Sequence, residues 1–446
     1  MAQNQKIDPS TLRITDIRVA DIVGAPMHCT LVKVYTNQGL VGFGEVRDGA
    51  SRNYILQLKS RVLGQNPCNV DRIFRRIKQF GHHARQGGGV SGLEIALLDI
   101  AGKAWGVPVY QLLGGKFRDR IRIYCDTDVN GKHTGKQMGE ALKKRMERGY
   151  TFLKMDVGIG LLQGVEGAIS APLGFLEEMR ALGSGWSRSH TATLEEREKG
   201  HRAYEMINIP HEMTAIQITE KGLDYLEQYV REVREVIGYD IPLAVDHMGH
   251  IGLGTTIRLA RRLEKFNLAW IEDPMPWYST EEYVRLSRAT TIPICTGEDI
   301  YLKENFRPLI EQNAVSVIHP DVLTTGGLLE TKKIGDMADE HGVAVAIHMA
   351  ESPIACLAAA HVAAALPNFL ALEFHSNDVD WWDDIAIGTD KPIVKNGFIE
   401  LSDAPGLGIT DLNDEVIREH LHPAYPDLWA DTGAWDFDPA HDRLWS

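Results

Sequence analysis

The 446-residue sequence has few cysteines and a deficit of positive charge. Its five cysteines are an odd number, are widely scattered and include no CxxC pair, which argues against a disulfide framework and a zinc knuckle. With 47 basic and 61 acidic residues the formal net charge is -14, which disfavours nucleic acid and anionic membranes as partners. This pattern is typical of a chain in a reducing compartment.

Long uninterrupted hydrophobic runs are also absent. The N-terminal stretch "MAQNQKIDPS" lacks the basic flank and apolar core of a signal peptide. The most apolar stretch, residues 354–372, is interrupted by His361 and Pro367, so it is interpreted as a buried helix leading into a strand. We therefore expect a cytoplasmic protein that has no membrane partner.

Residues 1–118 predict a small α+β domain, called the capping domain below. The stretch "LVKVYTNQGLVGFGEV" alternates on both sides of "NQG", which indicates a β-hairpin, and two helical patterns follow, "NVDRIFRRIKQF" and "SGLEIALLDIAGKAW". The glycine triplet in "RQGGGVSG" has no Lys-Ser/Thr after it. We interpret it as a flexible loop before the second helix rather than a phosphate cradle.

Residues 119–400 alternate short β-rich runs with helical stretches. Eight such repeats predict a parallel (β/α)8 barrel of the TIM type, followed by a C-terminal segment, residues 401–446, that is expected to pack back on the capping domain. A doubly wound sheet is the alternative, but no GxGxxG follows a first strand. The eight runs are "IRIYCDT", "TFLKMD", "PLAVD", "LAWIE", "IPICTGE", "VSVIHPD", "VAVAIH" and "FLALE".

One interval of the barrel is too long. Between Asp156 and Asp246 lie roughly 60 residues more than a β/α unit needs. The excess, roughly residues 159–221, follows a strand, and this places it on the face where barrel active sites lie. A lid is one interpretation, and an oligomer contact or a solvated excursion is the other.

Three strand runs end in an acidic residue: Asp246, Glu272 and Glu298. Each is 26 residues from the next, which is one β/α repeat, so the three carboxylates are expected to converge at the mouth of the barrel. Their mutual repulsion would protonate some of them unless a hard divalent cation is bound, and an all-oxygen ligand set suits Mg²⁺. The sequence therefore predicts a Mg²⁺ site, although each carboxylate alone would fit a helix cap or a surface ion pair.

Two later strand ends supply Asp321 and His348. An Asp carboxylate that accepts from the imidazole Nδ1–H fixes the tautomer and raises the basicity of Nε2, which makes a general base. Glu373, at the end of the eighth strand, is a candidate donor to a developing oxyanion if it is protonated, and otherwise a salt-bridge partner.

These motifs resemble the enolase superfamily, and within it the mandelate racemase-like group, over essentially the whole chain. The segments that carry the resemblance are "GLVGFGEV", "SGLEIALLDIAGKAWGVPVYQLLGG", "KMD", "AVDHMGH", "WIEDP", "TGED", "HPDV", "AIHMAESP" and "ALEFH". The resemblance implies Mg²⁺ on Asp246, Glu272 and Glu298, a His348–Asp321 acid/base dyad and Glu373 as an electrophilic partner. It also implies substrate-contacting loops around residues 26–30 and "GEVRDG".

The chemistry common to this superfamily is removal of the proton α to a carboxylate, after which its members diverge. We expect a sugar-acid dehydratase that eliminates the 3-hydroxyl of a small carboxylate substrate, acting as a homo-oligomer. A cycloisomerase or epimerase of an acid sugar or lactone is the alternative within the superfamily, and a non-catalytic sugar-acid sensor is the alternative outside it. A metal-dependent hydrolase would need an HxH pair on the first strand, where the sequence has none.

In the mandelate racemase-like pattern the second strand commonly reads Lys-x-Lys, with the second lysine as a base. Here it reads Lys154-Met-Asp156. Lys154 is expected to neutralise charge beside the metal, and Asp156 is expected to pair with it, to accept from a substrate hydroxyl or to act as a second base. Without a second lysine, the sequence favours one-base elimination by His348 over two-base racemisation.

A polyol substrate also needs hydrogen-bonding groups from the loops. The candidates are Arg47, His28, His82 and His247, of which Arg47 would clamp a distal hydroxyl or a second carboxylate.

Overall fold

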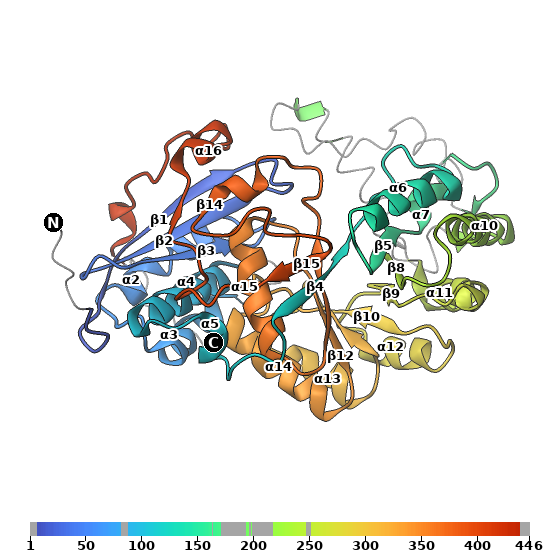
Figure 1. The fold of residues 1–446 in the computed structure, drawn as a ribbon. Coiled ribbons are helices and arrows are strands. Elements are labelled where there is room, and N and C mark those ends of the chain that lie inside the picture. The colour runs from blue at the N-terminus through green and yellow to red at the C-terminus, as the bar shows by residue number, and fades with distance from the viewer. Residues whose placement is uncertain are drawn as a thin grey trace. The chain divides into compact units, whose positions relative to one another are not determined.

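The computed structural model describes residues 7–81, 88–162, 164–170, 193–195, 198, 217–246 and 251–437 (Figure 1). The chain divides into two compact units. The first unit comprises residues 1–123, 297–307 and 318–446, and the second unit comprises residues 124–296 and 308–317.

The capping domain lies in the first unit and begins with a three-stranded antiparallel sheet of β1 (Ile14–Ile22), β2 (Cys29–Thr36) and β3 (Val41–Val46). The predicted hairpin is confirmed, because Thr30 of β2 pairs with Val46 of β3 and the turn falls at "NQG". Helix α4 (Gly88–Trp105) packs against β2 and β3, and nearly all of its side chains are buried. The shorter helices of this domain are α1 (Asn53–Leu56), α2 (Lys59–Val62), α3 (Val70–Ile77) and α5 (Val109–Leu112).

The prediction that the glycine triplet forms a flexible loop is wrong for Gly88 and Gly89. Gly88 and Gly89 are the first two residues of the helix and are buried. A Cβ at Gly88 would lie 2.6 Å from both the Cβ and the backbone nitrogen of Arg47. Gly88 is therefore required by the close approach of the helix to Arg47, the residue after β3, and Gly89 by its close approach to the backbone of Tyr54. Gly87, the first glycine of the triplet, lies outside the described residues.

The predicted parallel barrel is confirmed, and all eight expected strands are present. Its strands follow one another in the order β13-β12-β11-β10-β9-β8-β5-β4, and β13 also pairs with β4, so the sheet closes. The short antiparallel strand β15 (Phe398–Glu400) extends β4. The barrel strands are β4 (Arg120–Cys125), β5 (Leu153–Asp156), β8 (Leu243–Asp246), β9 (Ile271–Glu272), β10 (Ile294–Thr296), β11 (Val317–Ile318), β12 (Ala344–Ile347) and β13 (Phe369–Phe374).

The first helix of the barrel has a complete start signal. Helix α6 begins after Thr134, whose hydroxyl accepts from the Gln137 N–H while the Gln137 side chain accepts from the Thr134 N–H, a complete capping box. The other helices of the barrel are α10 (Glu220–Ile237), α11 (Gly252–Leu263), α12 (Thr280–Ser287), α13 (Lys303–Glu311), α14 (Leu328–Glu340) and α15 (Pro353–Ala365), and α6 itself spans Gly135–Glu147.

The apolar stretch at residues 354–372 forms buried α15 and the start of β13, as predicted. Among the residues that the structure describes, no helix has both the length and the apolar character that crossing a membrane requires.

Most of the predicted insertion, residues 159–221, lies outside the described residues. Its two ends are described: after α7 (Ile159–Leu162) the chain forms β6 (Ile169–Ser170), which pairs antiparallel with β7 (Gln217–Ile218) just before α10. The insertion therefore leaves and returns through a two-stranded ribbon. Its role as a lid stays a prediction.

The end of the described chain returns to the capping sheet within the first unit. Leu421 bridges Ile22 of β1, and the His422 N–H donates to the Asp21 carbonyl. Further along, the Lys59 ammonium of α2 donates to the Thr432 hydroxyl at 2.8 Å. The elements of this segment are β14 (Ala386–Ile387), β16 (Asp411–Leu412) and α16 (Asp414–Glu419).

Candidate active site

The second unit buries a lysine between two of the predicted metal ligands. Lys154 is 1% exposed, and its Nζ lies 2.8 Å from Asp246 Oδ2 and 2.9 Å from Glu272 Oε1. The ammonium also lies 4.0 Å from an oxygen of Asp126. Three carboxylates, of which Asp246 and Glu272 are buried, are thus gathered around one cation, which offsets much of the cost of burying them.

The strand pairing explains why these side chains meet. Strand β8 lies between β5 and β9 in parallel register, with Lys154 opposite Ala244 and Val245 opposite Ile271, so the ends of the three strands are neighbours. The Trp270 indole N–H donates to Glu272 Oε2 at 2.7 Å, so both oxygens of this carboxylate are engaged. Glu272 is therefore held in one orientation.

Asp156 ends β5 two residues after Lys154 and pairs in register with Asp246. Its negative charge contributes to the raised pKa of Tyr229 on α10, although burial of the phenol is the larger cause. Asp156 is partly exposed, unlike Lys154. Its role as a base, an ion-pair partner or a substrate acceptor stays a prediction.

The first unit contains the predicted acid/base dyad. His348 directly follows β12, and its Nδ1 lies 2.6 Å from Asp321 Oδ2. Asp321 is 1% exposed, and its other oxygen accepts from the Leu323 N–H at 2.6 Å. The carboxylate is thus fixed from the backbone side and holds the proton of His348 on Nδ1.

The environment of His348 raises the pKa of its imidazole. Burial and the positive charge of Arg47 lower this pKa, but the carboxylates of Glu298, Glu373 and Asp321 raise it by more. Nε2 faces Glu298 Oε2 at 3.0 Å. The nitrogen that would take a substrate proton therefore points at a predicted metal ligand.

Glu298 is positioned by the glycine before it. Gly297 has φ +147, a conformation that favours glycine, and a Cβ there would lie 2.8 Å from the Phe306 ring and 3.0 Å from the His319 nitrogen. A side chain at this position would clash with Phe306 and with the backbone of His319, so the residue before Glu298 must be glycine.

Glu373, the predicted electrophilic partner, lies among three histidines of the first unit. His375 Nε2 lies 3.0 Å from Glu373 Oε1, and His319 Nε2 lies 3.3 Å from Oε2. His348 Nε2 is 3.8 Å from the same Oε2. The sequence reasoning missed His319 and His375, although "HPD" and "EFH" place each two residues from a predicted site residue and hence on the same side of a strand.

Arg47, predicted to clamp the substrate, is fully buried in the first unit. Its side chain is 1% exposed and contacts the carboxylates of Asp48 at 2.7 Å, Asp321 at 3.6 Å and Glu298 at 3.8 Å. It also donates to Glu351. Glu351 was not singled out from the sequence, because only the folded chain brings residues 304 positions apart together.

The histidines predicted to bind substrate have different outcomes. His28 lies in the capping domain, where its Nε2 is 3.1 Å from Asp21 Oδ1 and its side chain is 35% exposed. His82 and His247 lie outside the described residues.

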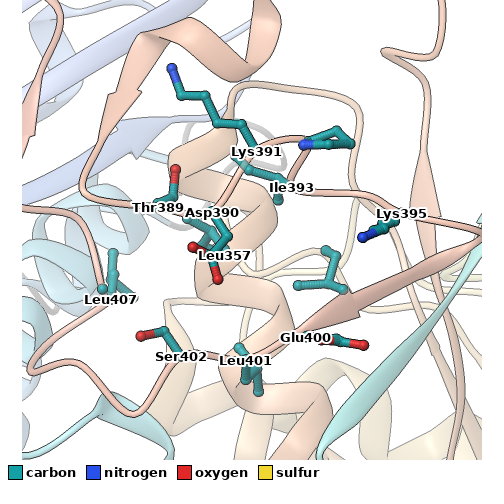
Figure 2. Close-up of a pocket in the computed structure, with 13 residues that line it drawn as sticks. Leu357, Thr389, Asp390, Lys391, Ile393, Lys395, Glu400, Leu401, Ser402 and Leu407 are labelled. Carbon is teal, nitrogen blue, oxygen red and sulfur yellow. The ribbon is translucent and has the colours of Figure 1, made fainter.

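A pocket of about 300 Å³ in the first unit lies apart from these residues (Figure 2). Lys391, Lys395 and Glu400 line it together with buried apolar side chains such as Leu357 and Leu407. None of the predicted site residues lines this pocket. It therefore contributes nothing to the chemistry described here.

Metal-binding capacity is present in both units. In the first unit, His348, Glu373 and His375 bring donor atoms within 4.8 Å of one another, which is close enough to share a metal ion. In the second unit, Asp246 and Glu272 both direct carboxylate oxygens at the Lys154 ammonium. Oxygen donors that already surround a positive charge suit a hard divalent cation.

Comparisons with known proteins agree with this arrangement. Residues 10–114 match the family "Mandelate racemase / muconate lactonizing enzyme, N-terminal domain", and residues 137–415 match "Enolase C-terminal domain-like". The D-xylonate dehydratase of Haloferax volcanii is 33% identical over 416 residues, covering 92% of this chain and 89% of that protein. The D-galactonate dehydratase of Verminephrobacter eiseniae is 27% identical over 407 residues, covering 88% and 91%.

Solved structures show the same relationship. A mandelate racemase/muconate lactonizing enzyme-like protein from Rubrobacter xylanophilus superposes with a TM-score of 0.77 at 29% identity, covering 93% of this chain and 99% of that one. A protein described as a putative dehydratase from Salmonella enterica serovar Typhimurium superposes with a TM-score of 0.74 at 26% identity, covering 92% and 99%. With both domains matched, the chain belongs to the mandelate racemase/muconate lactonizing enzyme family of the enolase superfamily.

Proposed function

We propose that this protein is a Mg²⁺-dependent dehydratase of a sugar acid, which removes the proton α to the carboxylate and expels the 3-hydroxyl to give a 2-keto-3-deoxy acid. The observation that carries the proposal is the His348–Asp321 pair, whose geometry leaves Nε2 as the proton acceptor. The relatives named as D-xylonate and D-galactonate dehydratases support this reaction class.

The chain's own residues divide the work. His348 Nε2 takes the C2 proton and, once protonated, delivers it to the departing hydroxyl, so one residue serves both steps on one face of the substrate and the elimination is syn. Glu373 donates a hydrogen bond to the developing oxyanion. Lys154 neutralises the charge of Asp246 and Glu272, and Asp156 orients the substrate at the end of β5.

Asp246, Glu272 and Glu298 are the proposed Mg²⁺ ligands. Mg²⁺, when bound, would supply the positive charge that stabilises the enediolate formed on proton removal. Lys154 supports this role from the protein side, because its ammonium donates to one oxygen of Asp246 and one oxygen of Glu272 and thereby orients both carboxylates. His28, His82 and His247 remain proposed contacts to the substrate hydroxyls.

The test is a screen of acid sugars with Mg²⁺, beginning with D-xylonate and D-galactonate, in which 2-keto products are detected and identified by NMR. His348→Asn is expected to lower kcat by a factor of about 10⁴ or more while Mg²⁺ binding is retained, because the general base is lost. The matched control is His341→Asn, since His341 is an exposed histidine at the end of α14 and is expected to leave turnover unchanged.

Each alternative has its own outcome in this screen. A product that keeps the 3-hydroxyl would point to an epimerase, and a cyclic or ring-opened product would point to a cycloisomerase. Binding of acid sugars with no solvent deuterium appearing at C2 would point to a sensor. A His348→Asn variant with a near-normal rate would remove the dyad from the mechanism.

A further inference from the structure

Arg47 directly follows β3, and its side chain contacts both the dyad and further carboxylates. On one side its Nε lies 3.6 Å from Asp321 Oδ2, the oxygen that also accepts from His348 Nδ1 at 2.6 Å. On the other side its Nη1 donates to Glu351 and to Asp48. The guanidinium therefore lies between the dyad and two further carboxylates.

Glu351 is itself firmly held. It lies three residues after His348 and is fully buried. Its Oε2 accepts from the Ala350 N–H at 2.9 Å, and its carbonyl oxygen accepts from the Trp382 indole N–H at 2.9 Å. A carboxylate fixed in this way gives the guanidinium a rigid anchor next to the catalytic histidine.

The backbone of Arg47 is also held. Two residues earlier, buried Glu45 accepts from both the backbone N–H and the hydroxyl of Ser352, at 3.2 and 2.6 Å. From the other side, Gly88 of α4 approaches the Arg47 backbone so closely that a Cβ would not fit. Two contacts thus hold the segment that carries His348 against the capping domain: Glu45 accepts hydrogen bonds from Ser352, and Arg47 donates to Glu351.

The chemistry of arginine suits this location. The Asp321 carboxylate must stay in place to hold the proton of His348 on Nδ1, and the Arg47 guanidinium, whose Nε lies 3.6 Å from Oδ2, restricts its movement. The planar fork of a guanidinium also fixes several carboxylates in one plane, which an ammonium does not do. A side chain that is 1% exposed has little surface left for a substrate hydroxyl.

We propose that Arg47 is a positioning residue, anchored by Glu351, which holds the Asp321 carboxylate in place and through it keeps the His348 imidazole in its Nδ1–H tautomer, and that it does not bind the substrate. This inference rests on the proposed function, since it assigns a task within the same dyad. It differs from the substrate clamp suggested by the sequence.

The kinetic test compares Arg47→Met, Arg47→Lys and Glu351→Gln. A misplaced base costs roughly 100-fold in rate, so Arg47→Met is expected to lower kcat by about that factor with KM within about 3-fold. Arg47→Lys is expected to recover part of the rate, because the charge is kept and the fork is lost. The kcat of Glu351→Gln is expected to lie between the values for wild type and Arg47→Met. This variant still tests the proposal if Arg47→Met does not fold.

The matched control is Lys59→Met. Lys59 is another buried cation of the capping domain, but it contacts Asp16, Asp436 and Thr432 rather than the dyad. The Lys59→Met variant is expected to have a lower free energy of unfolding than wild type and a kcat within about 2-fold of it. A kcat loss in Lys59→Met equal to that in Arg47→Met would mean that any damage to the capping domain slows turnover, and would overturn the assignment.

The second readout needs no substrate. In ¹⁵N-histidine-labelled, Mg²⁺-loaded protein, the His348 resonances are expected to show a proton on Nδ1 in wild type and in Lys59→Met, and a mixture of tautomers in Arg47→Met. A raised KM with unchanged kcat and an unchanged tautomer would return Arg47 to substrate binding and overturn the proposal. If wild type dehydrates no acid sugar, the proposed function fails, while the tautomer comparison still decides the role of Arg47.

Discussion

In each of the two units a buried cation contacts carboxylates of predicted site residues, Lys154 in one and Arg47 in the other, and the two are built into the fold differently. Lys154 stands on a barrel strand and reaches Asp246 and Glu272, which end the next two strands of the sheet. Arg47 follows a strand of the capping domain and reaches Asp321 and Glu351, which are about 300 positions away in the chain. The first arrangement follows from strand order, and the second depends on the packing of one domain element against another.

The difference between these two cations predicts different roles for them. A lysine ammonium is a compact point charge, and the carboxylates that it contacts are the proposed Mg²⁺ ligands, so a bound cation shares its task. The planar guanidinium of an arginine donates hydrogen bonds to several carboxylates in fixed directions, and a bound metal ion does not reproduce that geometry. We therefore expect Lys154 to matter chiefly for charge and Arg47 chiefly for orientation.

Two helices, α6 and α14, show the same contrast between a local and a distant contact in the way that they are capped. In the second unit, α6 is capped by its own Thr134 and Gln137. In the first unit, α14 begins at Gly327 without a side-chain cap of its own, and the Glu94 carboxylate of the capping domain accepts from the N–H groups of Leu328 and Leu329 at 2.7 and 3.0 Å. The capping domain thus completes a helix of the barrel that follows the Asp321 segment.

The largest effect is expected for Lys154→Met. Removing the ammonium leaves Asp246 and Glu272 as buried charges without their cation, which costs about 3 to 5 kcal/mol. Thermal unfolding in EDTA is expected to show this loss, and saturating Mg²⁺ is expected to restore most of it, because the ion supplies the missing charge.

Arg47→Met is the matched variant for this measurement. It is expected to be destabilised as well, but Mg²⁺ should return no more stability than it adds to wild type. If the two variants respond equally to Mg²⁺, the distinction between charge and orientation is wrong.

A smaller effect is expected from pH at the cap supplied by Glu94. Burial raises the pKa of Glu94 to about 8, although the N–H groups of Leu329 and Leu328 act in the opposite direction. Since the folded pKa lies above the ordinary value of 4.5, the stabilisation is fully present below pH 4.5 and is lost as pH rises through about 8. The slope is at most about 1.4 kcal/mol per pH unit for this one group.

Glu94→Gln removes this titration and keeps an acceptor for one backbone N–H. The free energy of unfolding, measured by urea titration from pH 5 to 8, should therefore fall less steeply with pH in the variant than in wild type. Glu304→Gln is a suitable control, because the pKa of that partly buried carboxyl is lowered through its backbone contact and nearby lysines. Parallel curves for wild type and Glu94→Gln would show that Glu94 is ionised in the folded protein throughout this range.

The contrast between the units also explains what could be predicted from the sequence. The barrel was predicted because strand periodicity is a local signal, and the predicted site residues Asp246, Glu272, Asp321 and His348 were placed at strand ends by the same signal. Glu351 was missed, and the helical start at Gly88 was misread, because both depend on Arg47 packing against distant chain. Sequence reasoning placed Arg47 in a substrate loop by its motif, whereas burial is a property of the folded domain.

The smallest effect is expected for Thr134→Ala in the local cap of α6. The Thr134 hydroxyl accepts from the Gln137 N–H at 3.2 Å at a solvent-exposed site, so its loss should cost about 1 kcal/mol of unfolding free energy. Thr134→Ser keeps the acceptor and should lose only a few tenths of a kcal/mol. Neither change should alter kcat, since this cap contacts no predicted site residue. If Thr134→Ala reduced turnover as strongly as it reduced stability, local caps in the second unit would be coupled to the chemistry, and the contrast with the distant caps of the first unit would disappear.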